Sequence, residues 1–455
     1  MTDDRAPLKF REKLGYGLGD TASNFFFATF NVFLLYYYTD VFGITAAAVG
    51  TMFLITKIID AVSDPIMGLI ADRTNSRWGK FRPYLLWGAI PYGLCGYAMF
   101  ANPDFSYTGK LIYAYVTYSL MMLAYTAINV PYSALMGVIS PVSIERTKVA
   151  SYRFFCAFAA GWLVGTFVTP LKNILGGGDE ALGFKLTMAI FAFISVTLFW
   201  ITFATTKERV VPVPEKSNIG RDLKVLLSNG PWKALFWAGI FTLVNIAVRN
   251  GTLLYYFKYY VGDDGTPLFW IFDKTAVFMS SGLLFMMIGV MMTKTLSERF
   301  EKRQLMIVLS TFTALSMAAF FFIPPEQYGL MLIVNALGTL ASGPTPALVW
   351  SMYADCADYG EWKTGRRTTA LVFSTVQFSH KMGLAVGAGL AGIILSWFGF
   401  VANEAQSETS MFGIRFMFSI FPTIFALLGV IAIFFYRIDR ATLLRMEQEL
   451  NTSRA

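Results

Sequence analysis

About twelve stretches of this 455-residue chain are apolar over a length that can cross the hydrocarbon core of a bilayer, which takes roughly 20 helical residues each. Inside a bilayer, every backbone N–H and C=O must be paired within the protein, and an α-helix achieves this by itself. Charged residues are only 15% of the chain, against about 25% in soluble domains. The sequence therefore predicts an all-α membrane protein. The expected spans lie near residues 14–39, 45–71, 83–102, 109–139, 150–176, 183–205, 233–261, 272–294, 304–323, 328–353, 368–399 and 410–436.

Lysine and arginine are unevenly distributed between the loops. Basic clusters precede the first span and recur at every second loop, whereas the alternate loops hold few basic residues. Because basic loops remain on the cytoplasmic side, we expect both termini to face the cytoplasm. The same asymmetry accounts for the net charge of +8, so this charge does not indicate a nucleic-acid partner.

A long polar stretch, from about Thr206 to Asn229, divides the expected spans six and six. This predicts an N-terminal six-helix bundle (1–205), a cytoplasmic linker (206–232), a C-terminal six-helix bundle (233–437) and a cytoplasmic tail (438–455). A faint repeat relates the ends of the fourth and tenth spans. Two repeats about an axis along the membrane normal are the build of major facilitator transporters, although helical channels can also have twelve spans.

Three ionisable residues, Lys57, Asp60 and Asp64, interrupt the second span. Their spacing of three and four places them on one helix face. Charge at this depth costs several kcal/mol by the lower estimates, so such residues usually pair or line an ion path. The two carboxylates are candidates for a cation site. The alternative is a permanent salt-bridged core that never exchanges an ion.

Charged loops are expected to form breakable networks on the cytoplasmic side, or else only to set the topology. The expected members are Asp72, Arg73 and Arg77 after the second span, and Asp355, Asp358 and Arg366 after the tenth. The three cysteines have no metal-ligand spacing, and no nucleophile elbow, phosphate-binding loop or zinc-protease motif occurs. These observations argue against an enzyme.

Several separated motifs carry a family resemblance along the whole chain. They are Asp60-Ala-Val-Ser-Asp64-Pro65-Ile66-Met67-Gly68, Arg77-Trp78-Gly79-Lys80, Tyr36-Tyr37-Tyr38-Thr39-Asp40, Arg153-Phe154-Phe155, Ala354-Asp355 with Asp358-Tyr359-Gly360-Glu361, and Lys381. In these motifs the chain resembles the glycoside-pentoside-hexuronide:cation symporters of the major facilitator superfamily, which include the melibiose permease. The resemblance implies a transporter of the bacterial inner membrane, without a cofactor, that imports a sugar with Na+ or H+ by alternating access.

The resemblance also implies roles for single residues in the cation site. Asp60 and Asp64 match the two acids that bind the coupling cation, which would make them a possible Na+ site, and Thr126 matches a nearby ligand. Asn24, at a family position that serves both sugar and cation, is the fourth expected member of the cation site. Lys381 matches a lysine near these acids, and Lys57 is a second expected coupling partner.

For the sugar, the family places polar groups on the first, fourth and fifth spans. The matching residues here are Asp20, Asn24, Tyr125, Asn129 and Arg153. Asn24 stands where the melibiose permease has an aspartate that serves both sugar and cation, and Asn129 also replaces an aspartate. These two losses put sodium coupling and galactoside preference in doubt. The alternative is that both amides only bond neighbouring helices.

Three residues of the second half are further sugar candidates. Trp350 is suited to stacking on a sugar or to packing, and Lys381 is a charged contact. Arg249 suits an acidic sugar, but pairing with Asp20 or with a backbone carbonyl is equally compatible with its position. The other functions considered are a cation-coupled lysolipid transporter, as in a vertebrate branch that resembles this family, and a membrane sensor without transport.

Overall fold

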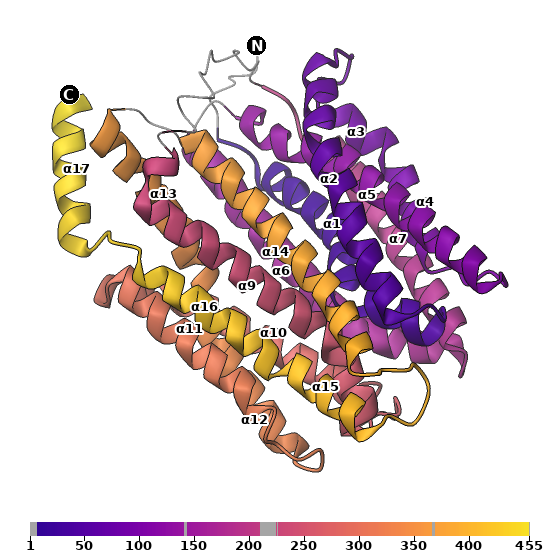
Figure 1. Ribbon diagram of the computed structural model, residues 1–455. Coiled ribbons are helices and arrows are strands. Elements are labelled where there is room, and N and C mark those ends of the chain that lie inside the picture. Colours follow the sequence, from indigo (N-terminus) through magenta and orange to yellow (C-terminus); the bar gives the residue numbers. More distant parts are fainter. Residues whose placement is uncertain (1–6, 141–142, 210–223, 225, 366–368, 455) are drawn as a thin grey trace. The chain divides into compact units, whose positions relative to one another are not determined.

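The structure is a computed structural model that describes residues 7–140, 143–209, 224, 226–365 and 369–454, apart from some side chains within helices. The described residues are almost entirely helical, and they contain one isolated bridge, between Phe269 and Phe272 (Figure 1). This confirms the all-α prediction. Eight stretches of the described chain are long and apolar enough, by length and composition, to cross a membrane.

Each predicted span coincides with one helix or with two consecutive ones. The elements are α1 (Phe10–Tyr36), η1 (Tyr37–Val41), α2 (Ala46–Arg73), α3 (Arg82–Trp87), α4 (Ala89–Met99), α5 (Tyr107–Val138), α6 (Ser143–Gly176), α7 (Glu180–Thr205), α9 (Gly230–Tyr255), η2 (Tyr256–Val261), α10 (Lys274–Arg299), α11 (Lys302–Ala319), α12 (Tyr328–Ser342), α13 (Thr345–Thr364), α14 (Thr369–Trp397), α15 (Glu408–Phe418), α16 (Ile420–Phe434) and α17 (Arg440–Arg454).

The contacts between residues divide the chain into two compact units. Unit 1 comprises Met1–Pro214 with Asp263–Ser280 and Val401–Ala405, and unit 2 comprises the remainder. Unit 1 therefore includes two short segments from the second half of the sequence. The predicted domain bounds of 1–205 and 233–437 stay a prediction.

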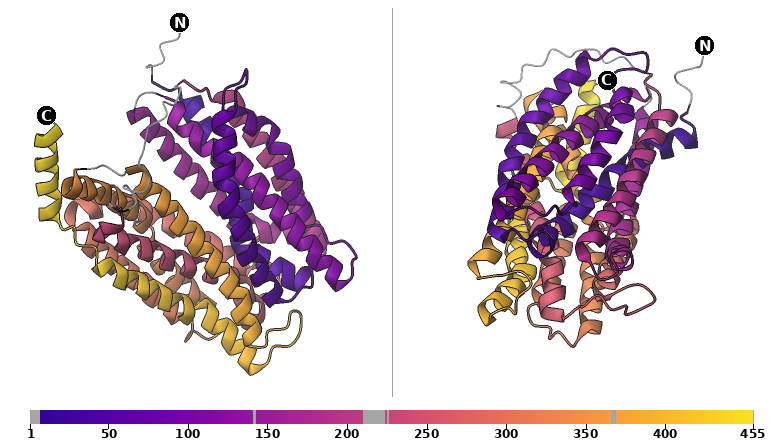
Figure 2. Two further views of the ribbon diagram at one scale, coloured as in Figure 1. Left: turned by 45° about the horizontal axis from the view of Figure 1, so that its top comes forward. Right: turned by 90° about the vertical axis from the view of Figure 1, so that its right-hand side faces the viewer.

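In unit 1, α1 packs along α6 and α7, which run beside it (Figure 2). Glycines of α1 permit this close approach, since a Cβ on Gly17 would lie 2.8 Å from the Sγ of Cys156 on α6, and one on Gly19 would lie 3.1 Å from the Oγ1 of Thr202 on α7. Tyr16 and Tyr132 then lock α1 to α5. Each hydroxyl donates to the backbone carbonyl of the other residue, at 2.9 and 2.6 Å, and the two rings stack with centroids 4.6 Å apart. This packing fixes the helices that carry the candidate site.

A sequence repeat marks the ends of α1 and α9. Leu34–Gly43 and Leu253–Gly262 both begin Leu-Leu-Tyr-Tyr, and both contain a π-helical turn, η1 and η2. Each stretch ends on a glycine with positive φ, 84° at Gly43 and 71° at Gly262. The first helix of each unit thus ends in the same way. This similarity supports the internal repeat that the ends of the fourth and tenth spans indicate.

The start of the linker is clasped onto unit 1. The carboxylate of Glu208 accepts the backbone N–H groups of Lys80, Phe81 and Arg82 at 2.8–3.0 Å. Gly79 makes room for it, because its φ is +106° and a Cβ there would lie 2.5 Å from the Glu208 carboxylate. The Arg77-Trp78-Gly79-Lys80 motif therefore includes a carboxylate-binding turn at the start of α3.

Ion pairs join the beginnings of α1 and α6 at the same end of unit 1. Buried Glu145 lies 3.0 Å from the Nζ of Lys13 and 2.7 Å from the Nζ of Lys148. The hydrogen bonds from Lys148 and Lys13 lower the pKa of Glu145 to about 2. Arg209 pairs with Glu12 at 2.6 Å and donates to the carbonyl of Ile139 at the end of α5. The ends of α1, α5 and α6 are thus held together.

Candidate functional site

A shared hydroxyl links the two carboxylates of the second span. The Oγ1 of Thr126 on α5 lies 3.2 Å from Asp60 Oδ1 and 3.0 Å from Asp64 Oδ1, both on α2. The Oγ of Ser63, which lies between the two acids in sequence, is 3.4 Å from the Thr126 hydroxyl. Asp60 is 96% buried, with 4% of its surface exposed. Two carboxylates and two hydroxyls therefore gather where α2 packs on α5.

The local sequence explains this cluster. Residues 60, 63 and 64 share one face of α2 by their spacing, and that face packs on α5. One hydroxyl proton can serve only one carboxylate at a time, so the hydroxyl of Thr126 by itself does not satisfy both acids. Oxygen donors of this kind suit a hard cation or a proton. Among the described residues, no group of three or more His, Cys, Asp or Glu side chains is placed to hold a metal ion.

A second charged pair joins α1 to α6. Arg153 Nε lies 3.2 Å from Asp20 Oδ1, and the guanidinium carbon is 5.3 Å from the ring centroid of Tyr132. This bond leaves the other Asp20 oxygen as an acceptor and the terminal nitrogens of Arg153 as donors. Arg249 was one suggested partner for Asp20; the structure pairs Asp20 with Arg153 instead.

The ion pair and the carboxylate cluster lie at similar depths in unit 1. Counting at 1.5 Å per residue from the end of the unit held by Glu145 and Arg209, Asp20 and Arg153 are ~15 Å deep, and Thr126 and Asp60 are ~18–20 Å deep. Helices of 27 to 34 residues carry all four side chains. These residues therefore lie near the middle of their helices.

The two asparagines make local contacts. Asn129 accepts from Ser23 Oγ at 2.9 Å and donates to the carbonyl of Tyr125 at 3.1 Å. Asn24 donates to the carbonyl of Asp20, on its own helix, at 2.8 Å. The Asn129–Ser23 bond joins α5 to α1. It matches the expected alternative in which the Asn129 amide bonds a neighbouring helix and not the sugar. The Tyr125 ring stacks near Phe27, with centroids 6.0 Å apart.

Arg249 of unit 2 contacts a break in the last span. Its Nη1 donates to the carbonyl of Phe418 at 2.9 Å, and its guanidinium lies 4.2 and 4.8 Å from the ring centroids of Phe418 and Phe320. Pro422 has no N–H to offer that carbonyl four residues earlier, so Arg249 supplies the missing donor. Thr252 donates to the adjacent carbonyl of Met417 at 3.3 Å. Of the roles expected for Arg249, these contacts match the pairing with a backbone carbonyl.

Replacing Arg249 with methionine is therefore expected to destabilise the protein more than it changes substrate affinity. The loss of a donor to a buried carbonyl costs about 1–3 kcal/mol, partly offset because a charge no longer has to be buried. Thermal unfolding in detergent and the KM of uptake measure the two effects. Asn250→Ala, on the next residue, is the control. A raised KM with unchanged stability would instead assign Arg249 to the substrate.

The remaining candidates of unit 2 lie on α13 and α14. The Trp350 ring meets those of Tyr353 and His380 edge to face, with centroids 6.4 and 6.3 Å apart. Lys381 follows His380 on α14. Trp350, Lys381 and Arg249 belong to unit 2 and the acids to unit 1, so their expected convergence on one sugar stays a prediction.

The expected gating residues are only partly described. Asp355 pairs with Lys302 of α11 at 2.8 Å, and the Tyr436 hydroxyl is 3.4 Å from the same oxygen. Arg77 lies over the ring of Trp78 at 4.1 Å. Arg73 is exposed in the last turn of α2, and Asp358 lies on α13. The side chains of Lys57 and Asp72, and all of Arg366, lie outside the described residues.

The structure adds residues that the sequence interpretation missed. Ser63 lies on the carboxylate face of α2, and its spacing from Asp60 and Asp64 could have revealed it. Ser23, Glu208 and Lys302 become partners only through packing between distant segments. For these three, no local pattern in the sequence points to the contact.

Comparisons with known proteins agree with this architecture. A family model described as MFS/sugar transport protein matches residues 15–440. The chain is 37% identical over 450 residues to the putative glycoside/cation symporter YagG of Escherichia coli (strain K12), covering 98% of this chain and 96% of that protein. It is 34% identical over 439 residues to the isoprimeverose transporter of Lactiplantibacillus pentosus, covering 94% and 89%.

Solved structures show the same fold. A crystal structure of a D-xylose–proton symporter superimposes with a TM-score of 0.61 at 14% identity, covering 94% of this chain and 97% of that one. The predicted major facilitator fold is thereby confirmed. The chain belongs to the MFS/sugar transport protein family, and it is a multi-pass membrane transporter and not an enzyme.

Proposed function

We propose that this protein is a cation-coupled symporter that imports a glycoside, pentoside or hexuronide by alternating access. The observation that carries the proposal is the Thr126 hydroxyl between Asp60 and Asp64. Buried carboxylates within a membrane helix are costly unless they serve an ion or a partner. A cation bound between the two acids would relieve their mutual repulsion, and its binding would be coupled to the binding of the sugar.

The proposed sugar site in unit 1 consists of Asp20, Arg153, Asn24, Asn129 and Tyr125. Asp20 offers its second carboxylate oxygen as an acceptor, and Arg153 offers the terminal nitrogens of its guanidinium as donors, which suit paired bonds to sugar hydroxyls. Tyr125 and its stacked neighbour Phe27 offer aromatic faces for the apolar side of a sugar ring. The names of the two relatives, a glycoside/cation symporter and an isoprimeverose transporter, support a glycoside.

The coupling ion is proposed to be Na+ or H+. Asn24 and Asn129, which stand at the positions of two family acids, bond to Asp20, Ser23 and Tyr125 and not to Asp60 or Asp64 within the described chain. The proposed cation ligands are therefore the two acids with Thr126 and Ser63. We further propose that the protein lies in the bacterial inner membrane with both termini in the cytoplasm, as the basic loops predict.

An uptake panel in proteoliposomes tests the proposal. Labelled glycosides, pentosides and uronides are each supplied with an imposed Na+ gradient or an imposed pH gradient, and empty liposomes are the control. We expect accumulation of at least one sugar above its external concentration with one of the two gradients. Equal uptake with and without both gradients would contradict coupling, and no uptake of any sugar would contradict the substrate class.

A further inference from the structure

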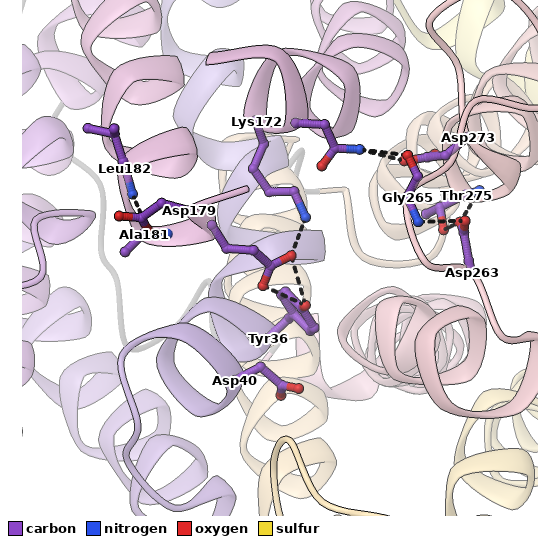
Figure 3. A network of polar contacts seen from close by, with 12 residues as sticks. Tyr36, Asp40, Lys172, Asp179, Ala181, Leu182, Asp263, Gly265, Asp273 and Thr275 are labelled. Carbon is purple, nitrogen blue, oxygen red and sulfur yellow. Dashed lines mark hydrogen bonds and ion pairs between the residues drawn. The ribbon is translucent and has the colours of Figure 1, made fainter. Parts of the chain in front are cut away.

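The connection between η2 and α10 is docked on unit 1, although most of the helices it joins belong to unit 2. Residues Asp263–Ser280 form part of unit 1 by their contacts. Side chains of α6 hold this segment. The contacts are Trp162 Nε1 to Ser280 Oγ at 3.2 Å, the rings of Phe167 and Phe272 at 5.9 Å, and Asn173 Nδ2 to the Gly265 carbonyl at 3.3 Å (Figure 3 shows the last of these).

At the centre of the docked segment lies a buried carboxylate. Asp273 is 1% exposed, and its Oδ1 accepts the backbone N–H of Ala276 at 2.8 Å, which caps the start of α10. Its Oδ2 lies 3.4 Å from Asn173 Nδ2 on α6. The Ala276 N–H and the Asn173 amide are neutral, so neither compensates the charge of an ionised Asp273.

The charged groups around Asp273 act in opposite directions, because Asp263 disfavours its ionised form and Lys172 favours it. Asp263, in the same segment, accepts hydrogen bonds from the N–H and the hydroxyl of Thr275 at 2.8 and 2.5 Å. The negative charge of Asp263 disfavours a second negative charge on Asp273. Lys172 of α6 is the facing cation, but its Nζ lies 2.5 Å from Glu180 of α7 (Figure 3).

Further charged and titratable groups surround these residues. Glu180 also accepts from the hydroxyl of Tyr36 on α1, and the segment itself carries Asp264 and Lys274. Burial, with the help of Asp263, raises the pKa of Asp273 from its ordinary 3.8 to about 6, against the lowering effects of the Ala276 N–H, Lys172 and Asn173.

We propose that Asp273 is a proton-binding site, distinct from the Asp60–Asp64 pair, whose protonation holds the segment Asp263–Ser280 on unit 1. A neutral Asp273 is compatible with its buried position between Asn173 and the start of α10. An ionised Asp273 must be buried beside Asp263 or move into water with the segment. The segment then acts as a pH-sensitive latch on the connection from η2 to α10, whichever ion drives transport.

The direction of the pH effect follows from the raised pKa. The proton binds more tightly to the docked form, so docking is strongest below about pH 4, weakens as the pH rises, and is constant above about pH 6–7. Between pH 5 and pH 7, the ratio of docked to undocked segment is expected to fall by about tenfold.

Distances between two spin labels test the latch without any transport assay. One label replaces Leu268, which is exposed and belongs to a turn closed by backbone bonds between Leu268, Phe269 and Phe272. The other replaces exposed Phe193 on α7 of unit 1, in a full-length chain whose three cysteines are changed to alanine. At pH 5, the frozen sample is expected to show a single distance between the labels, that of the docked segment. At pH 7.5, a second distance, that of the undocked segment, is expected to appear in a larger fraction of the molecules.

Variants separate the latch from a general effect of pH. Asp273→Asn is expected to stay docked at both pH values, whereas Asp264→Asn, which changes an exposed acid of the same segment, should respond like the parent. Asn173→Asp places another carboxylate against Asp273 and is expected to undock the segment already at lower pH. A parent whose distances do not change with pH, or an Asp273→Asn variant that responds like the parent, would overturn the proposal.

Discussion

Replacing Asp60 or Asp64 with asparagine is expected to abolish uphill accumulation of the sugar while leaving exchange or binding. Each change removes one of the two carboxylates that face the Thr126 hydroxyl, and with it the charge that balances the cation. A charge that moves across 100 mV supplies about 2.3 kcal/mol, which corresponds to about 50-fold accumulation. That driving force is lost when no cation moves with the sugar.

The measurement is the steady-state ratio of internal to external sugar in energised proteoliposomes, together with sugar exchange at zero gradient. Asp104→Asn, a change of an exposed acid in a loop of the same unit, is the matched control. Variants that still concentrated sugar like the parent would remove Asp60 and Asp64 from coupling. They would also favour the alternative of a permanent ionic core.

Replacing Asp20 with asparagine is expected to weaken both the fold and sugar binding. The change leaves Arg153 without its carboxylate partner between α1 and α6. Breaking a buried ion pair from one side costs about 3–5 kcal/mol, and the partial exposure of Arg153 places this case at the lower end. Thermal unfolding in detergent measures the stability, and the KM of uptake measures the sugar.

A double variant separates these two consequences. Asp20→Asn with Arg153→Gln removes both charges, so we expect it to regain much of the stability lost in Asp20→Asn. It should not regain sugar affinity, because the charged donors and acceptor are gone. A double variant as unstable as the sum of the two single ones would show that the pair has no direct coupling.

The positions of the spans could be predicted because the bilayer imposes a minimum length of apolar helix on each of them. Helical spacing likewise predicts that one face of α2 carries Asp60, Ser63 and Asp64. The interruptions of the spans could not be predicted. The break before Ile420 depends on Pro422 together with Arg249 and Thr252, which are more than 160 residues away in sequence. The π-helical turns of η1 and η2 were also missed, because apolar length alone does not encode them.

Pairings between side chains were harder to predict than their locations. Asp20 and Arg153 were both expected at the site, but their pairing depends on the close approach of α1 to α6. Asn173 and Asp273 are separated by 100 residues and meet only because the connection before α10 docks on unit 1. The sequence thus predicts which residues are polar within the membrane, while packing decides which of them become partners.

The interrupted last span has a consequence for how the protein is made. Its two pieces have 11 and 15 residues, and neither alone reaches the roughly 20 needed to cross the bilayer. The two pieces must therefore insert together, before Arg249 has bound the Phe418 carbonyl. Arg249 is synthesised earlier and becomes that partner when α9 packs on this span. We expect the Arg249→Met chain to accumulate with a protease-sensitive last span, a defect of assembly that precedes any effect on transport.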